Sequence, residues 1–378
     1  CAATGAMAFC PLKLTALTKP SHLGDGAATS KRSAVQAGGV HDFWAMTRYV
    51  IVPMRKWLQQ YGALSRNAFV VALGSPFSLV LALTILSVQA FLGALPFFTF
   101  GEQLRLVRDQ SLALCLLGGC LAAGLGAAIV FVEDIRNGAA PVVMSRPVSG
   151  FCFVAGKWSG LVLSLAVIHS LASVGCLWLT KITASAETLD SAGLSLYVGA
   201  VVVALVVMAV KHYLLGGCYV WQANVALVVC FLLAFSADLG LGQFTAEGAH
   251  GFGGVDWQTG KACLQVFFCL VVFSGVMALL ATVADVGLLL TGAVLVFFCG
   301  MLSETAIRSL LGNGLPATFA RVVLPNWQLY WVNDTLAEGR AVPWAYVMRS
   351  SVHAFCYCLV ALVVATWFFR RHELEGRA

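Results

Sequence analysis

The chain has little charge for its length. Only 11% of its 378 residues are Asp, Glu, Lys or Arg, whereas 60% are hydrophobic, and the mean hydropathy is +0.87. Soluble domains carry about a quarter charged residues. This composition excludes an ordinary soluble domain. It predicts an all-α, polytopic integral membrane protein, because a helix pairs its own backbone polar groups inside the bilayer.

Signatures of catalysis and of metal binding are also missing. The sequence contains no HExxH and no Gly-x-Ser-x-Gly, and its 13 cysteines form no CxxC pair. Residues 150–157 end in Gly-Lys, but Phe151 stands where a Walker loop needs its first glycine and Trp158 follows the lysine. We therefore expect no metal, no cofactor, no nucleic-acid partner and no ATP site in this chain.

Long apolar runs are abundant. The second of them carries small residues such as Gly118, Gly119 and Gly126, which favour close helix packing. Two of the runs, 225–241 and 286–301, are short, so tilted, thinly spanning and re-entrant arrangements all stay open. We predict six to eight transmembrane helices, from the candidate runs 77–100, 111–132, 151–179, 194–218, 225–241, 262–282, 286–301 and 343–369. The runs are joined by polar connections that include 101–110, 242–261 and 302–342.

Three regions follow along the chain. Residues 1–40, rich in Ala, Gly, Ser and Thr, are predicted to be a disordered cytoplasmic tail. Residues 41–66 mix aromatic and basic side chains, which suits an interfacial amphipathic helix, although an ordinary surface helix interrupted by Pro53 is the alternative. Residues 67–378 form the transmembrane domain. Fifteen of the 23 Lys and Arg residues fall on the side of the N-terminus if all eight runs cross. Both termini are then expected in the cytoplasm, with the chain in the cytoplasmic (inner) membrane.

The connection between the second and third runs, residues 133–150, has a distinctive order. An acidic and basic helix end is followed by a glycine, a short apolar stretch, a Pro-Val-Ser turn and then Gly156-Lys157. The candidate coupling residues in it are Glu133, Asp134, Arg136, Gly138, Ala139, Ala140, Pro141, Val142, Val143, Met144, Ser145, Arg146 and Pro147.

This order resembles the cytoplasmic segment of permease subunits of type-2 ATP-binding-cassette (ABC) exporters, in the copper-enzyme-maturation-like branch. Supporting similarity is found in Phe100-Gly101-Glu102-Gln103, Leu324-Pro325-Asn326-Trp327-Gln328 and the ending from Trp367 to Glu373, so the resemblance covers roughly residues 77–373. That class usually has six spans, whereas eight candidates are counted here.

The resemblance implies a transport subunit rather than an enzyme. Residues 139–144 would form a short helix that docks on a separate ABC ATP-binding subunit, which binds and hydrolyses the ATP. The other expected partners are a second permease copy, identical or similar, and the lipid bilayer. The sequence does not indicate the substrate.

Other interpretations fit the same residues. The segment 133–150 could be a loop whose charges sit in water, and Lys157 could snorkel to lipid headgroups rather than contact a partner. An ion-gradient-driven secondary transporter would need an intramembrane carboxylate, and none is expected near the middle of a span. A membrane-embedded enzyme would rely on His169 or His353, which we otherwise expect to be neutral histidines hydrogen-bonded to a neighbouring helix.

Overall fold

The computed structural model describes residues 40–95, 102–136, 148–183, 190–245, 255–312 and 314–375. Within these ranges the regular structure is helical, without a β-strand. Contacts divide the chain into two units, Cys1–Lys56 and Trp57–Ala378, and every candidate span lies in the second. The predicted tail, residues 1–40, falls outside the described residues except for Val40.

Eight helices in the described part of the chain are long and apolar enough to cross a membrane. The chain is an all-α, multi-pass membrane protein, as the composition predicts. These helices are α2 (Pro76–Ala94), α3 (Gln103–Ala127) with the π-helix η1 (Ala128–Val132), α6 (Gly150–Ile182), α7 (Ser191–Leu215), α8 (Tyr219–Thr245), α9 (Trp257–Leu280), α10 (Val286–Leu311) and α13 (Trp344–Glu375).

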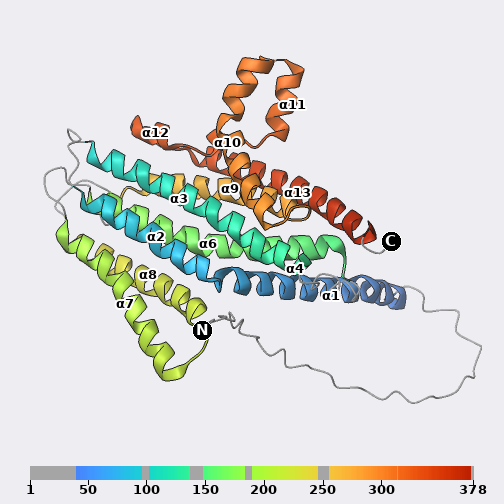
Figure 1. The fold of residues 1–378 in the computed structure, drawn as a ribbon, viewed down its shortest axis with the longest axis horizontal. Helices are drawn as coiled ribbons and strands as arrows, with labels where there is room; N and C mark the ends of the chain where they lie inside the picture. The colour runs from blue at the N-terminus through green and yellow to red at the C-terminus, as the bar shows by residue number, and fades with distance from the viewer. Residues whose placement is uncertain are drawn as a thin grey trace, which may run out of the picture. The chain divides into compact units, whose positions relative to one another are not determined.

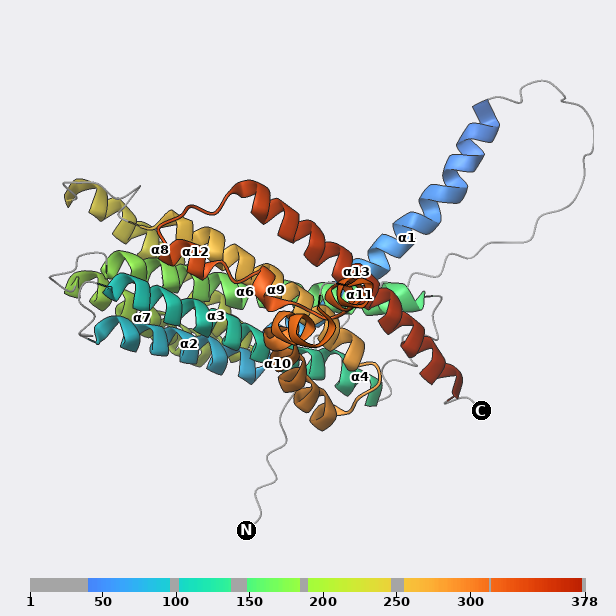
Figure 2. The same cartoon turned by 90° about the horizontal axis from the view of Figure 1, so that it is seen from above.

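Short helices complete the described structure: α4 (Glu133–Arg136), α11 (Leu315–Val323), the 3₁₀-helix η3 (Trp327–Leu329) and α12 (Asn333–Ala337). Figures 1 and 2 show α2, α3, α6 and α9 lying side by side as a bundle. In Figure 1, the outer part of α10 and α11 form a hairpin that stands away from this bundle.

The centre of the bundle is α3, of whose span 78% is buried, against 17% for α10. The small residues of α3 explain this position. A Cβ added at Gly118 would collide with the side chain of Ile85, and one at Gly126 with Leu161. The close packing expected of the second span is therefore confirmed, because neighbouring side chains occupy the space that larger residues would need.

The predicted lengths of two helices are wrong. Helix α8 has 27 residues and α10 has 26, so both helices are longer than the predicted runs 225–241 and 286–301. Polar residues end the apolar runs in the sequence, but in the fold they are paired: Asn224 near the start of α8 donates to the Leu73 carbonyl, and Glu304 of α10 accepts from Arg308. The helices can therefore continue through them.

The predicted connection 101–110 is also corrected, since α3 already begins at Gln103. Arg108, on its second turn, is only 6% exposed and forms an ion pair of 3.4 Å with Asp256, the N-cap of α9. This pairing lets a charged residue sit between two helices instead of in a loop.

Helix α1 (Val40–Leu73) runs through Pro53 without a break and ends seven residues beyond the predicted 66. Its last turns pack tightly on α6, where a Cβ at Gly160 would meet the Ser65 carbonyl and the Ala68 side chain. A location of residues 41–66 in the bilayer interface stays a prediction.

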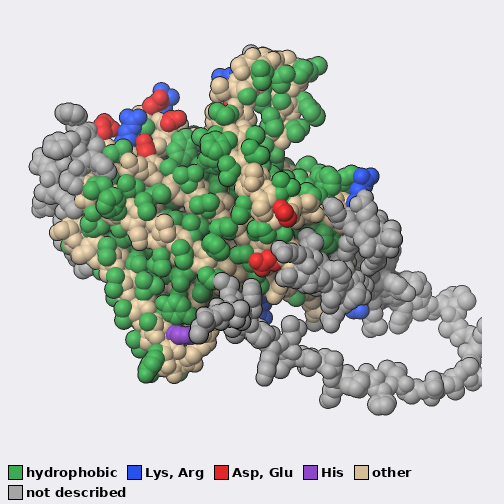
Figure 3. Space-filling model, in the orientation of Figure 1, with side chains coloured by type: hydrophobic (Ala, Val, Ile, Leu, Met, Phe, Trp, Pro, Cys, Tyr) green, Lys and Arg blue, Asp and Glu red, His purple; other side chains and the backbone are tan. Residues whose placement is uncertain are grey.

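The surface of the bundle is apolar. In Figure 3 hydrophobic side chains cover most of the visible face, and charged ones gather around α12 and around α4 and the end of α13. Exposed valines run along α7 at positions 202, 206 and 210, one helical turn apart. A stripe of this kind suits contact with lipid chains.

Candidate functional site

The predicted coupling segment follows a π-helical turn at the end of α3. Residues Ala128–Val132 form a π-helix, and the four-residue helix α4 follows with Glu133 and Asp134 in its first turn. Short π turns inside α-helices occur frequently at functional sites. The turn lies directly before the acidic residues that the sequence selects.

Lys157 of α6 lies against this helix end. Its side chain is 3% exposed, and its ammonium forms an ion pair with Asp134, whose side chain is 39% exposed. The ammonium also donates to the Val130 carbonyl at 2.6 Å and lies 4.7 Å from the ring centroid of Phe153. A carboxylate, a carbonyl and an aromatic face thus replace water around the buried charge.

Of the two alternatives for Lys157, snorkelling to lipid headgroups does not fit the structure. The side chain turns inward, because Asp134 and Val130 supply its acceptors within the protein. Asp134 thereby pairs with α6. Sequence reasoning missed this contact, although a lysine inside an apolar run is itself a signal that a buried acceptor must exist.

The start of α6 is fixed on its other side as well. Ser149 caps the helix by accepting a hydrogen bond from the Cys152 amide at 3.2 Å. The rings of Phe153 and Phe369, the latter on α13, are stacked with centroids 5.1 Å apart. The first turn of α6 is therefore held both to the end of α3 and to α13.

Of the other predicted coupling residues, the structure describes Glu133 and Arg136. Glu133 lies in the first turn of α4 beside Asp134, and Arg136 ends that helix. Residues 137–147, which hold the predicted docking helix and the candidates from Gly138 to Pro147, lie outside the described residues. The structure describes the two helix ends that flank them.

His169 is a structural histidine. Its Nε2 lies 2.9 Å from the Cys263 carbonyl on α9 and 3.1 Å from the Ser173 hydroxyl. The expected hydrogen bond to a neighbouring helix is confirmed. Neither contact provides the carboxylate that would orient a catalytic base.

Among the described residues, the hydrogen-bond partner of His353 on α13 is the hydroxyl of Tyr330, at 2.8 Å from its Nδ1. Lys211 and His212 are exposed at the end of α7, and Asp285 caps α10 by accepting from the Leu288 amide, as expected of a residue in the turn between two hairpin arms.

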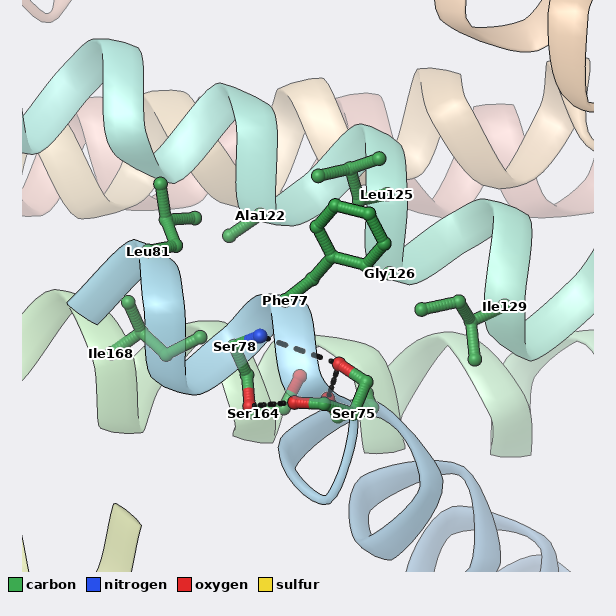
Figure 4. Close-up of a pocket in the computed structure, with 11 residues that line it drawn as sticks. Ser75, Phe77, Ser78, Leu81, Ala122, Leu125, Gly126, Ile129, Ser164 and Ile168 are labelled. Carbon is green, nitrogen blue, oxygen red and sulfur yellow. Dashed lines mark hydrogen bonds between the residues drawn. The ribbon is translucent and has the colours of Figure 1, made fainter. Parts of the chain in front are cut away.

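A small hollow, partly open to the outside, lies between the end of α1 and helices α2, α3 and α6. Figure 4 shows apolar side chains around it, among them Phe77, Leu125 and Ile168. Its serine hydroxyls donate to backbone carbonyls: Ser78 to Leu73 at 2.6 Å and Ser164 to Leu161 at 2.8 Å. The hollow thus resembles a gap in the packing of apolar helices more than a polar binding site.

No group of three or more His, Cys, Asp and Glu residues in the described ranges could hold a metal ion. The chain matched none of the family models, curated proteins and solved structures with which it was compared. The functional interpretation therefore depends on the residues and their geometry.

Proposed function

We propose that this chain is the membrane-spanning permease subunit of an ABC exporter in the cytoplasmic membrane. It moves its substrate with energy from ATP that a separate subunit binds and hydrolyses. The observation that carries the proposal is the Lys157–Asp134 ion pair. It ties together the two helices between which residues 137–147, including the predicted docking helix 139–144, are inserted.

Coupling requires a stiff joint. A force applied to residues 137–147 reaches the bilayer only if the helix ends on both sides move with them. Because Lys157 binds both Asp134 and the Val130 carbonyl, the end of α3 and the start of α6 are displaced together. Close contact of α3 with α9, where Leu270 fills the space beside Gly119, extends the motion into the bundle.

The residue roles follow from this scheme. Residues 139–144 dock on the ATP-binding subunit, and Glu133 and Arg136 pair with it or hold the helix end. Asp134 joins the segment to α6. A second permease copy completes the pathway, with both termini of each copy in the cytoplasm.

A pull-down experiment tests the proposal. An ABC ATP-binding subunit encoded beside this chain should be retained by a tagged copy of it in mild detergent. Deletion of residues 139–144, or replacement of Arg136 by Ala, should lower the retained ATPase and its ATP hydrolysis. Glu338→Gln, an exposed change in the turn after α12, is the matched control. Equal retention by the deletion variant and the control would contradict the proposal.

A secondary transporter is the weaker alternative. Glu304 does lie within α10, but its carboxylate accepts from Arg308 Nε at 2.7 Å and pairs with Arg321 Nε at 3.4 Å. A carboxylate that carries protons or ions must become free during transport, whereas two arginines already bind this one. Transport in vesicles that contain an ion gradient but no ATP would favour this alternative.

A membrane enzyme built on histidine is the other alternative. Neither His169 nor His353 has a carboxylate among its described hydrogen-bond partners. Alanine at both positions with function retained would exclude it, and loss of function without loss of folded protein would favour it.

A further inference from the structure

The chain between α10 and α13 lies beside the middle of other helices rather than beyond their ends. Tyr357 stands at the centre of the 28-residue span Trp344–Arg371, and its hydroxyl donates to the Val323 carbonyl at 3.0 Å. Tyr346, in the first turn of the same helix, donates to the Leu329 carbonyl at 2.5 Å. Residues 323–330 thus follow the first half of α13.

Trp327 fixes this segment to two further helices. Its indole nitrogen donates to the Phe297 carbonyl, in the middle of α10, at 3.0 Å, and its ring lies 5.9 Å from that of Phe273 on α9. A Cβ at Gly300 would collide with the indole, so glycine is what allows the close approach. Trp327 is 2% exposed.

Several backbone groups of the segment are paired within the protein. The amide of Gln328 donates to Asn326 Oδ1 at 3.0 Å, and the amide of Tyr330 donates to the Trp327 carbonyl at 3.0 Å. Irregular backbone is tolerated at membrane depth only when its polar groups are paired or line a water-filled cavity.

The two ends of this region lie at opposite ends of α9. Val286, where α10 begins, follows the end of α9 after a short turn. Val342 is next to the start of α9, because its carbonyl accepts from Lys261 at 2.9 Å. The chain from 286 to 342 therefore covers the full length of α9 once.

We propose that residues 286–342 form a single, discontinuous membrane crossing. Helix α10 enters the bilayer, and residues 323–330, an irregular segment that contains the short 3₁₀-helix η3, continue the crossing inside it, before α12 reaches the far surface. The arrangement explains why so little of α10 is buried, and it keeps the number of crossings even. It does not depend on the proposed transport function.

Cysteine labelling in membranes tests this topology. Gln328 and Glu338 are both exposed on the protein surface, so the proposal requires that lipid shields the first from a water-soluble reagent and leaves the second accessible. We expect a membrane-impermeant maleimide to modify Gln328→Cys at least about tenfold more slowly than Glu338→Cys, since charged reagents do not enter the hydrocarbon. Open membrane fragments give the reagent access to both faces.

Two controls keep the result unambiguous. The unmodified chain, with its 13 native cysteines, gives the background, and both variants should react at similar rates after denaturation in SDS. Leu324→Cys, at another exposed position, replaces Gln328→Cys if that variant does not accumulate. Equal rates at 328 and 338 in intact membrane fragments would overturn the proposal, because a loop in water gives that result.

Discussion

Removing Asp134 should destabilise this protein more than removing its partner Lys157. Asp134→Ala leaves a lysine that is 3% exposed without its carboxylate. Stranding a buried charge costs about 3–5 kcal/mol, and the lower end applies here because Val130 still accepts from the ammonium. Lys157→Met removes the charge and keeps most of the aliphatic volume. The remaining Asp134 is 39% exposed and can be hydrated, so the loss is about 1–2 kcal/mol.

The double variant gives the sharper measurement. With both charges gone, no buried charge is left without its partner, and the stability loss of the double variant should be close to that of Lys157→Met alone. The loss in the double variant should therefore be smaller than the sum of the two single losses by about 3 kcal/mol, the loss of Asp134→Ala, as expected of residues in direct contact. Unfolding by SDS in mixed micelles, followed by circular dichroism, measures all four proteins. Strict additivity, or equal damage from the two single changes, would refute the buried ion pair.

Two further predictions concern packing and can use the same titration. Gly160→Ala should destabilise the protein by about 1–3 kcal/mol, because the added methyl meets the Ser65 carbonyl. Its control is Gly199→Ala, which has nothing within 4 Å and should be neutral or stabilise the protein by up to about 1 kcal/mol. Equal effects of the two changes would contradict the α1–α6 contact. Trp327→Phe should cost about 1 kcal/mol through loss of its hydrogen bond to Phe297, and an unchanged stability would argue against the described position of the indole.

The approximate positions of the membrane helices could be predicted, because each contains a long apolar run that is visible in the sequence. The predicted run 151–179 differs from α6 (Gly150–Ile182) by at most three residues at either end. The length of α10 could not be predicted. Glu304 and Arg308 end its apolar run in the sequence, and only the contact with Arg321 of α11 shows how their charges are compensated.

The candidate site was predictable in outline but not in its contacts. The order of residues selects Glu133, Asp134 and Arg136, but the neighbouring sequence does not indicate that Asp134 binds a lysine 23 positions later. That pairing depends on the π turn at the end of α3 and on the depth at which α6 begins, and both are properties of the packed bundle. The position of the irregular segment 323–330 could not be predicted for a similar reason, because its partners Tyr346 and Tyr357 lie on a later helix.

The location of residues 137–147 tests the central claim most directly. A cysteine introduced at Ser145 can be labelled with a membrane-impermeant maleimide in intact cells and in inverted membrane vesicles. The unmodified chain, with its 13 native cysteines, gives the background. A docking segment for a cytoplasmic ATPase should react in inverted vesicles and stay protected in intact cells, and the bound ATP-binding subunit should slow the reaction. Modification of Ser145→Cys from outside intact cells would contradict the account, since no ATP-hydrolysing partner could reach it there.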